Sequence, residues 1–358
     1  MNTRKIINLG KYVNSKDMWY KLILIIILFM CIVISASLGS ADLSVSDSLK
    51  IIFSRIPYFG KRIDLSEIAE VYLRIVWQIR MPRILLAGLV GCGLSVVGAA
   101  FQGLFRNPLA DPHILGVSSG AALGATLAML SGIGLHFFGL GVIGTFAFFG
   151  ALLTAFIVYQ ISCVGSKLPV VNILLTGTAI STMLSSVISL LMTFHHDKIE
   201  KVFLWTMGTF SAATWDRVLF LFIFTVTCCG VLILFSTELD VITTGNDTAE
   251  SLGINTVRIK KIIMIVASLQ VAACVSVSGI IGFVGLVIPH CIRMISGPRH
   301  KGLLPLSCIG GAIFMIICDT IARNAAAPSE IPVGVITAML GTPYFIYLLQ
   351  RNKKGGLS

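Results

Sequence analysis

The chain has 358 residues, of which 56% are hydrophobic and only 12% charged, and its mean hydropathy is +0.93. A soluble domain carries about 25% charged residues, so this composition excludes a soluble globular protein and predicts an integral membrane protein. The net charge of +11 does not indicate nucleic-acid binding, because the basic residues are dispersed between apolar segments and no nucleic-acid-binding motif organises them.

Ten segments are apolar enough to be membrane spans, for which a helix needs roughly 20 residues. A basic N-terminal tail, 1–21, precedes the first; a secretory signal is the alternative, but the apolar run is long for a signal and many spans follow. We predict an all-α membrane protein with ten transmembrane helices in a single transmembrane domain, 1–358. The expected spans are 22–38, 84–100, 114–130, 141–161, 170–192, 218–235, 262–278, 280–292, 304–321 and 333–349.

Three connections between the expected spans are long and polar. Residues 39–76 are mixed in charge and are expected to hold a short amphipathic helix outside the membrane. The loop 195–217 contains His195 and His196, which could ligate a metal or a haem edge, although a polar loop supplies such residues by chance. The third connection, 238–261, is the one that is typical of a soluble helical segment.

Ten spans place both ends of the chain on one side, and the charges indicate which side. The connections on the side of the termini carry 16 Lys and Arg against six Asp and Glu, whereas the opposite side carries 11 against ten. An excess of Lys and Arg marks the cytoplasmic face of a membrane. We therefore expect the tail 1–21, the segment 238–261 and the tail 350–358 to be cytoplasmic, in a multi-pass protein of the cytoplasmic membrane.

The stretch 102–124 interrupts the apolar pattern with prolines. A proline frees a backbone group that lipid cannot satisfy, so such a break survives only inside protein or beside a water-filled cavity. The segment Asn107-Pro108-Leu109, next to a cytoplasmic boundary, therefore predicts a gate, with a plain turn as the alternative.

Three glycines follow in the same stretch with a spacing of four residues. Gly116, Gly120 and Gly124 fall on one face of a helix, where small residues allow another backbone to approach closely. We expect these glycines to pack helices together.

Nothing in the sequence indicates catalysis, a bound cofactor or a metal site. The nine cysteines lie in or beside apolar segments without metal-ligand spacing and are expected to be reduced. The phosphate-binding pattern GxxxxGK[ST] is absent from the sequence, so the chain is not expected to hold ATP itself. We expect it not to be an enzyme.

Three arginines at the outer ends of spans are unexpected, because that side is poor in basic residues. Arg80, Arg83 and Arg323 could extend to lipid headgroups, or they could form a docking site for an acidic partner.

Five motifs stand out along the chain: WQIRMPR (77–83), FQGLFRNPLADPHILGVSSGAALG (101–124), SGIIGFVGLVIPHCIRMISGPRHKGLLP (278–305), CDTIAR (318–323) and SEIPVGVITAMLGTPYFIYLL (329–349). Together they resemble the motifs of the FecCD, or BtuC-like, permeases of type II ABC importers. The resemblance implies a ten-span subunit that pairs with a second copy or a paralogue around a translocation path. It also implies two cytoplasmic ATPase subunits, which hold ATP and Mg²⁺, and an extracytoplasmic substrate-binding protein.

The resemblance also assigns roles to residues. It implies docking of the binding protein at Arg80, Arg83 and Arg323, and a cytoplasmic gate at Asn107 and Leu109 and, by alignment position alone, at Val170 and Val171. The segment 246–258 is similar to the helices that couple permeases to their ATPases. The coupling residues are Asn246, Asp247, Thr248, Ala249, Glu250, Ser251, Leu252, Gly253 and Ile254.

The family imports iron chelates, haem and cobalamin, and we expect an iron–siderophore as the cargo, with cobalamin and haem as alternatives. An ion-coupled secondary transporter would need ionisable residues within the membrane, and few acids lie in the expected spans. A receptor or structural membrane protein is the third alternative; it would lose no transport on deletion of 246–258.

Overall fold

The computed structural model describes residues 3–39, 43–55, 60, 63–66, 68–133, 139–163 and 169–355, and within them every regular element is helical. Seven helices are long and apolar enough to cross a membrane, and three shorter apolar helices accompany them. The long helices are α1 (Thr3–Ser37), α4 (Met81–Leu104), α6 (Gly141–Ser162), α7 (Val170–Phe194), α9 (Trp215–Leu234), α12 (Thr256–Ser278) and α14 (His300–Asn324). The shorter ones are α5 (Val117–Ser131), α13 (Val284–Ser296) and α15 (Val333–Gly355).

The ten predicted spans fall on these seven long and three shorter helices, which confirms the all-α membrane fold. Two of them are short for a bilayer: α5 has 15 residues and α13 has 13, against the roughly 20 that cross the hydrocarbon core. A 3-10 turn, η3 (Pro112–Leu115), precedes α5, and an irregular segment, 279–283, precedes α13. Both breaks lie against other helices, as a break in a membrane requires.

The central element is a rod, Glu70–Leu104, in which α3 (Glu70–Arg74), the π-helical turn η2 (Ile75–Arg80) and α4 follow one another without a gap. Its most apolar window is 89% buried. Small residues allow this burial: Gly91 of α4 lies against the backbone of Gly311 in α14, and Gly98 against Gly285 in α13. The other helices therefore pack around α4.

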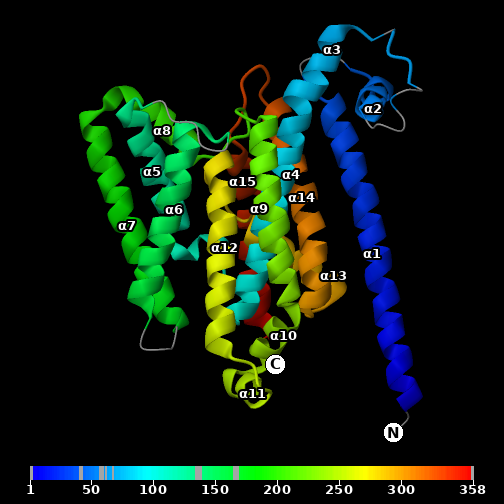
Figure 1. The fold of residues 1–358 in the computed structure, drawn as a ribbon, viewed down its shortest axis with the longest axis vertical. Coiled ribbons are helices and arrows are strands. Elements are labelled where there is room, and N and C mark those ends of the chain that lie inside the picture. The colour runs from blue at the N-terminus through cyan, green and yellow to red at the C-terminus, as the bar shows by residue number, and fades with distance from the viewer. Residues whose placement is uncertain are drawn as a thin grey trace.

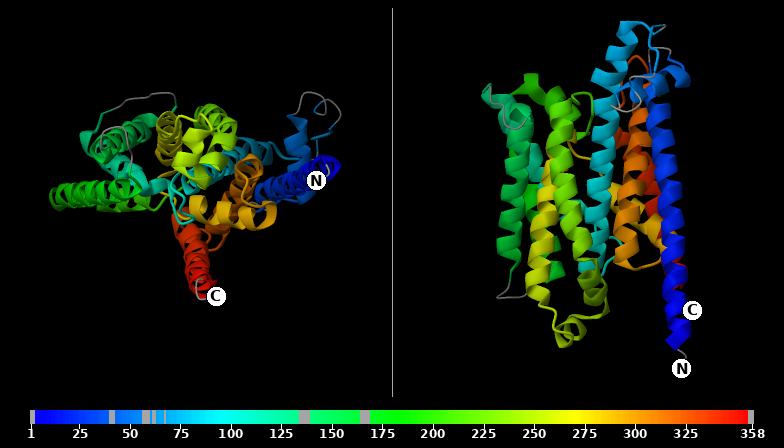
Figure 2. Two further views of the ribbon diagram at one scale, coloured as in Figure 1. Left: turned by 90° about the horizontal axis from the view of Figure 1, so that it is seen from below. Right: turned by 45° about the vertical axis from the view of Figure 1, so that its right-hand side comes forward.

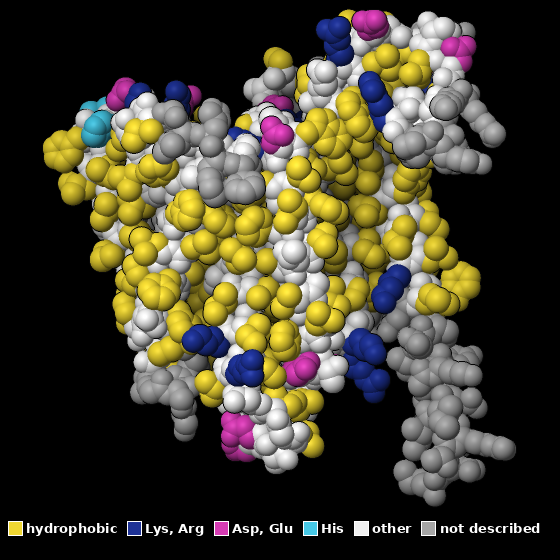
Figure 3. All heavy atoms as spheres, in the orientation of Figure 1, with side chains coloured by type: hydrophobic (Ala, Val, Ile, Leu, Met, Phe, Trp, Pro, Cys, Tyr) yellow, Lys and Arg dark blue, Asp and Glu magenta, His cyan; other side chains and the backbone are white. Residues whose placement is uncertain are grey.

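The helices at the periphery expose apolar side chains. Only 11% of the apolar window is buried in α1 and in α7, and Figure 2 shows both at the margins of the bundle, with α15 projecting separately. Figure 3 shows hydrophobic side chains over the middle of the molecule and charged ones toward its two ends. This distribution is that of a protein embedded in lipid.

Different short helices mark the two ends of the bundle (Figure 1). The α3 end carries α2 (Val45–Ser54), α3 and α8 (Ile199–Thr206); the α11 end carries α10 (Ser236–Thr244) and α11 (Asn246–Ser251), and both chain termini lie there. The expected helix within 39–76 is thus α2, whereas 195–217 is not a simple loop, because it contains α8. Residues 1–2 and 356–358 of the expected tails lie outside the described residues.

Candidate functional site

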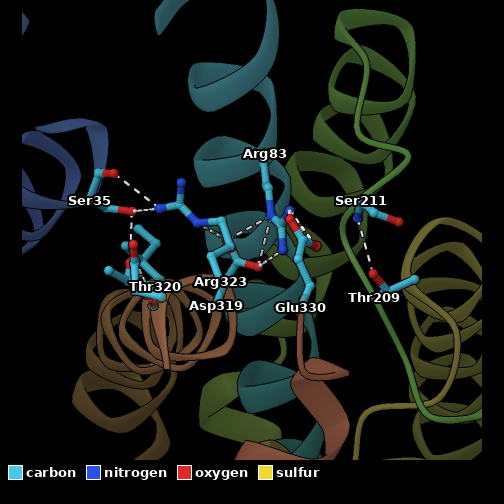
Figure 4. A network of polar contacts seen from close by, with 10 residues as sticks. Ser35, Arg83, Thr209, Ser211, Asp319, Thr320, Arg323 and Glu330 are labelled. Atoms are coloured by element: carbon cyan, nitrogen blue, oxygen red, sulfur yellow. Dashed lines mark hydrogen bonds and ion pairs between the residues drawn. The ribbon is translucent and has the colours of Figure 1, made fainter. Parts of the chain in front are cut away.

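A cluster of charged side chains lies at the α3 end, where α4 begins and α14 ends (Figure 4). We call Arg80, Arg83, Asp319, Arg323 and Glu330 the arginine cluster. They come from η2, from the first turn of α4, from the last turns of α14 and from the segment between α14 and α15. The cluster thus joins parts of the chain that are far apart in sequence.

Proline explains the local backbone around the first two arginines. Pro82 has no N–H and cannot continue the regular ladder, and the residue before it, Met81, donates its N–H to the carbonyl of Val76, five residues back. The resulting π turn is a feature that often marks functional sites.

Arg83 is the centre of the cluster because it binds two carboxylates through different edges of its guanidinium group. Its Nε and Nη2 donate to Asp319 Oδ1 at 3.0 and 2.9 Å, and its Nη1 donates to the two carboxylate oxygens of Glu330 at 2.8 and 2.9 Å. The side chains of Arg83 and Asp319 are 9% and 1% exposed, whereas that of Glu330 is 42% exposed. One partner is therefore sealed inside the protein and the other reaches its surface.

The other two arginines bind the end of α1. Arg323 Nη2 donates to the carbonyl and the hydroxyl of Ser35 at 3.0 and 2.8 Å, and its Nε lies 3.4 Å from Asp319 Oδ2. Arg80 Nη1 donates to the carbonyls of Ala36 and Ser37 at 2.7 and 2.9 Å. The last carbonyls of a helix lack partners within it and form the negative end of its dipole, so a guanidinium group stabilises them.

The structure thus brings the three predicted docking arginines together, but all three also have partners within the chain. A hollow of about 370 Å³ opens beside them, lined among others by Arg80, Arg83, Arg323, Asn324 and Glu330. A carboxylate entering this hollow would meet three guanidinium groups whose charge is only partly balanced by two acids.

At the α11 end, Arg106 joins the loop after α4 to the predicted coupling segment. Its Nε donates to the carbonyl of Ile242 in α10 at 2.9 Å, and its Nη2 donates to Asn246 Oδ1 in α11 at 2.6 Å. Lys260 of α12 also donates to Asn246 Oδ1, at 3.0 Å. The loop, α11 and α12 therefore meet at one amide side chain.

A second connection ties α10 to α14. Asp240 Oδ1 accepts from the backbone N–H of His300 at 2.8 Å and lies 2.6 Å from His300 Nδ1. Movement of α10 and α11 would therefore be passed to both α4 and α14, which are neighbours in the bundle.

The helix α11 ends in a turn around Gly253. Gly253 has φ of +81°, its N–H donates to the carbonyl of Glu250 at 2.9 Å, and the N–H of Ile254 donates to that of Ala249 at 3.0 Å. This pair of bonds is the Schellman motif, which needs a left-handed residue after the helix. Ala249 is buried and Leu252 is 67% exposed, so the turn presents an apolar side chain to its surroundings.

The remaining predicted coupling residues, Asp247, Thr248, Glu250 and Ser251, all have exposed side chains.

The predicted gate residues lie in two segments. Asn107 Oδ1 accepts from the N–H of Leu109 at 2.9 Å, which closes a tight turn, and both residues are half-buried. Val170 and Val171 begin α7 at the α11 end (Figure 1); Val170 packs on the core and Val171 is 63% exposed. The structure places both pairs near the same end of the bundle.

The predicted packing glycines lie on α5 or at its start. A Cβ added at Gly120 would clash with Thr154 Oγ1, and one at Gly124 with the carbonyl oxygen of Phe146, both on α6. Gly116 has φ of +69° and precedes the first residue of α5. Gly120 and Gly124 therefore pack so closely against α6 that no side chain fits at either position.

The side chains considered for metal binding do not form a site. His195 Nδ1 lies 3.0 Å from the carbonyl of Leu191, and Asp197 pairs with Lys198 at 3.0 Å. Among the described residues, no three His, Cys, Asp or Glu side chains could hold one metal ion. All nine cysteines are free in the structure.

Sequence reasoning missed a stripe of hydroxyl groups along α7. The exposed hydroxyls each donate to the carbonyl three or four residues earlier, at 2.9 to 3.0 Å. Their spacing of three or four residues places them on one helical face, and this spacing was visible in the sequence. They belong to Thr178, Thr182, Ser186, Ser189 and Thr193.

Comparison with known proteins identifies this architecture. A family model described as the FecCD transport family matches residues 25–351. The chain belongs to the FecCD transport family. Its FecCD relatives are permease subunits of ABC transporters, in which the ATPase is on separate chains, and the chain is accordingly a multi-pass membrane permease.

Two FecCD relatives illustrate the range of cargo. The cobalamin import system permease protein BtuC of Halobacterium salinarum is 42% identical over 280 residues, which are 77% of this chain and 73% of the relative. The Fe(3+)-citrate import system permease protein YfmD of Bacillus subtilis is 35% identical over 342 residues, 95% of this chain and 96% of the relative.

A solved structure confirms the BtuC-like permease fold. A protein described as a metal-chelate type ABC transporter in an inward-facing conformation has a TM-score of 0.78 and 31% sequence identity with this chain, and the match covers 92% of this chain and 98% of that one.

Proposed function

We propose that this FecCD permease is the membrane subunit of an importer that moves an iron complex, an iron–siderophore in the first instance, across the cytoplasmic membrane. One observation carries the proposal: the exposed hydroxyl stripe of α7. Each hydroxyl oxygen can still accept a hydrogen bond from water, so this face of α7 suits the wall of a water-filled path. Because each hydroxyl already donates within α7, few donors remain to retain the cargo, and conduction requires release as much as entry.

A single chain supplies one wall of such a path. In the proposal, a second copy of this chain or a paralogue supplies the other, and exposed apolar side chains of α7 and α15, such as Leu175 and Met339, face that partner or the lipid. Asn107, Leu109, Val170 and Val171 then close the path at the α11 end.

In this assembly the α11 end faces the cytoplasm. Both chain termini lie there (Figure 1), and the connections on the side of the termini carry the excess of Lys and Arg that marks the cytoplasmic face. The exposed Leu252 offers an apolar anchor to a cleft in each of two ATPase subunits.

The contacts at the α11 end suggest how ATPase movement reaches the path. A displaced α11 pulls on Arg106 through Asn246, and Arg106 belongs to the loop that carries the proposed gate residue Asn107. The ATPase dimer thereby biases an equilibrium between inward-open and outward-open forms.

At the α3 end, the arginine cluster docks an extracytoplasmic substrate-binding protein through acidic side chains. The hollow beside Arg80, Arg83 and Arg323 has the size and the charge for an entering carboxylate.

Uptake of competing cargoes by one preparation tests the choice of substrate. Vesicles would hold the permease and its ATPase, with the loaded binding protein outside, and would be offered a ferric hydroxamate, ferric citrate, haem or cobalamin at equal concentration. The proposal expects ATP-dependent accumulation of a ferric complex. Faster accumulation of cobalamin or haem would assign that compound as the cargo, and the protein would still be a subunit of an ATP-driven importer.

A further inference from the structure

Arg83 binds two carboxylates, and the ion pair with Asp319 is harder to break than the one with Glu330. Asp319 is 1% exposed, contacts Arg83 through two guanidinium nitrogens and lies 3.4 Å from Arg323. Displacing the Asp319 carboxylate would leave the buried guanidinium groups of Arg83 and Arg323 without their shared counter-charge, which is costly in free energy. Glu330 is 42% exposed and contacts Arg83 through Nη1 alone, so it can exchange its partner for water at far lower cost.

Arg83 and Glu330 also line the same hollow. Arg80 and Arg323 line it too. A carboxylate from a docking protein and the carboxylate of Glu330 therefore compete for the same donor.

We propose that Glu330 is an internal competitor for the acidic partner. It neutralises the Nη1 edge of Arg83 while the site is free, and the partner's carboxylate displaces it on docking while Asp319 keeps its place. This inference rests on the docking role proposed above for the arginine cluster and adds to it a residue of the permease that sets the affinity.

Displacement of Glu330 would act on the segment that leads into α15. The next residue, Ile331, donates its N–H to the carbonyl of Ala322 at 3.1 Å, and Val333 donates to the carbonyl of Gly208 at 3.0 Å. Glu330 lies only three residues before α15 begins. Docking at the arginine cluster would therefore also affect the start of α15, which lies apart from α7 in the bundle (Figure 2).

The test measures the affinity of the labelled substrate-binding protein of the same transport system for the permease–ATPase complex in nanodiscs, over a series of salt concentrations. Glu330→Gln removes the competing charge, and Glu330→Asp keeps the charge but shortens its reach by one methylene. We expect Glu330→Gln to tighten docking about two- to fivefold, the range that corresponds to a partly exposed ion pair, and Glu330→Asp to tighten it less. In Glu330→Gln the docking affinity should depend more steeply on salt concentration, because the partner's carboxylate then pairs with Arg83 without first breaking the ion pair between Glu330 and Arg83.

A matched control is Glu70→Gln, which removes the same charge from the same end of the molecule. Glu70 is exposed and pairs only loosely with Arg74, at 3.6 Å. Equal tightening by Glu70→Gln and Glu330→Gln would overturn the inference, because it would show a general effect of charge. Unchanged or weakened docking in both Glu330 variants would overturn it too.

Arg83→Gln separates this inference from the docking proposal on which it rests. If Arg83→Gln weakens docking and the Glu330 variants leave the affinity unchanged, the docking role of the arginine cluster stands and the competitor role of Glu330 is wrong. Docking that is indifferent to Arg83→Gln removes both. Should one Glu330 variant fail to assemble, the other still gives the affinity.

Discussion

At the scale of single residues, each buried charged side chain of the arginine cluster has more than one polar partner. Asp319 lies between Arg83 and Arg323, at 2.9 and 3.4 Å, and is almost completely buried. Arg80 and Arg323 satisfy the carbonyl groups at the end of α1. The cluster therefore fastens three helices together at one end of the bundle, whatever else it binds.

Replacing Asp319 by Asn should destabilise the protein by about 3–5 kcal/mol, because it leaves two buried guanidinium groups without their shared counter-charge. Thermal unfolding of the detergent-solubilised permease measures this. Glu70→Gln, which breaks an exposed pair, should cost less than about 1 kcal/mol. Equal effects of the two substitutions would show that the Asp319 pairs contribute little.

Arg106 should act on coupling and not on folding, because its side chain is exposed. Arg106→Ala removes two hydrogen bonds. Because water competes for both bonds at an exposed side chain, their combined net contribution should be about 1.4 kcal/mol, so the coupled state should lose about tenfold in population. We expect ATP hydrolysis to continue while uptake per ATP falls. Lys260→Ala removes the other contact to Asn246 Oδ1 and should have a smaller effect; a reversed order would remove Arg106 from the connection.

At the scale of elements, close helix packing depends on whether a glycine faces a neighbouring backbone or open space. Gly124 of α5 faces the carbonyl of Phe146 in α6, whereas no atom of the described residues lies within 4 Å of the position that a Cβ would take at Gly230 of α9. The same substitution should therefore have opposite effects at the two sites.

Gly124→Ala should destabilise the bundle by about 1–3 kcal/mol, because α5 and α6 must separate. Gly230→Ala should stabilise it by about 0.5–1 kcal/mol, because alanine loses less backbone freedom in a helix. Thermal unfolding of both variants is the measurement. A neutral Gly124→Ala would mean that α5 and α6 can separate without cost.

The helix α11 should need its apolar tip. Leu252→Asp places a charge where Leu252 is 67% exposed, so the permease should still fold but should recover much less ATPase on co-purification. Leu252→Met keeps the apolar character and nearly the volume and should retain the ATPase. Full recovery of ATPase with Leu252→Asp would remove this residue from the interface.

At the scale of the whole molecule, composition and apolar pattern predicted most of the fold. The ten apolar segments and the short helix within 39–76 follow from local sequence, because the length and polarity of a helical segment are local properties. The helix α8 was missed because its apolar residues lie in a segment that is polar on average.

The contacts of the candidate sites could be predicted only in part. The arginines were visible as charges on the wrong side, but Arg83 and Glu330 are 247 residues apart in sequence, and no local pattern pairs them. The link from Arg106 to Asn246 spans 140 residues and was missed for the same reason. The spacing of the α7 hydroxyls was local, and attention to period as well as to hydropathy would have found them.

The most direct test of the account is the source of energy for uptake. Vesicles that hold the permease with its ATPase would be given a radiolabelled ferric complex on the external binding protein, either with ATP inside and no ion gradient or with a proton or sodium gradient and no ATP. The account predicts accumulation with ATP alone and its loss in Leu252→Asp. Accumulation that follows the ion gradient and ignores ATP would contradict it.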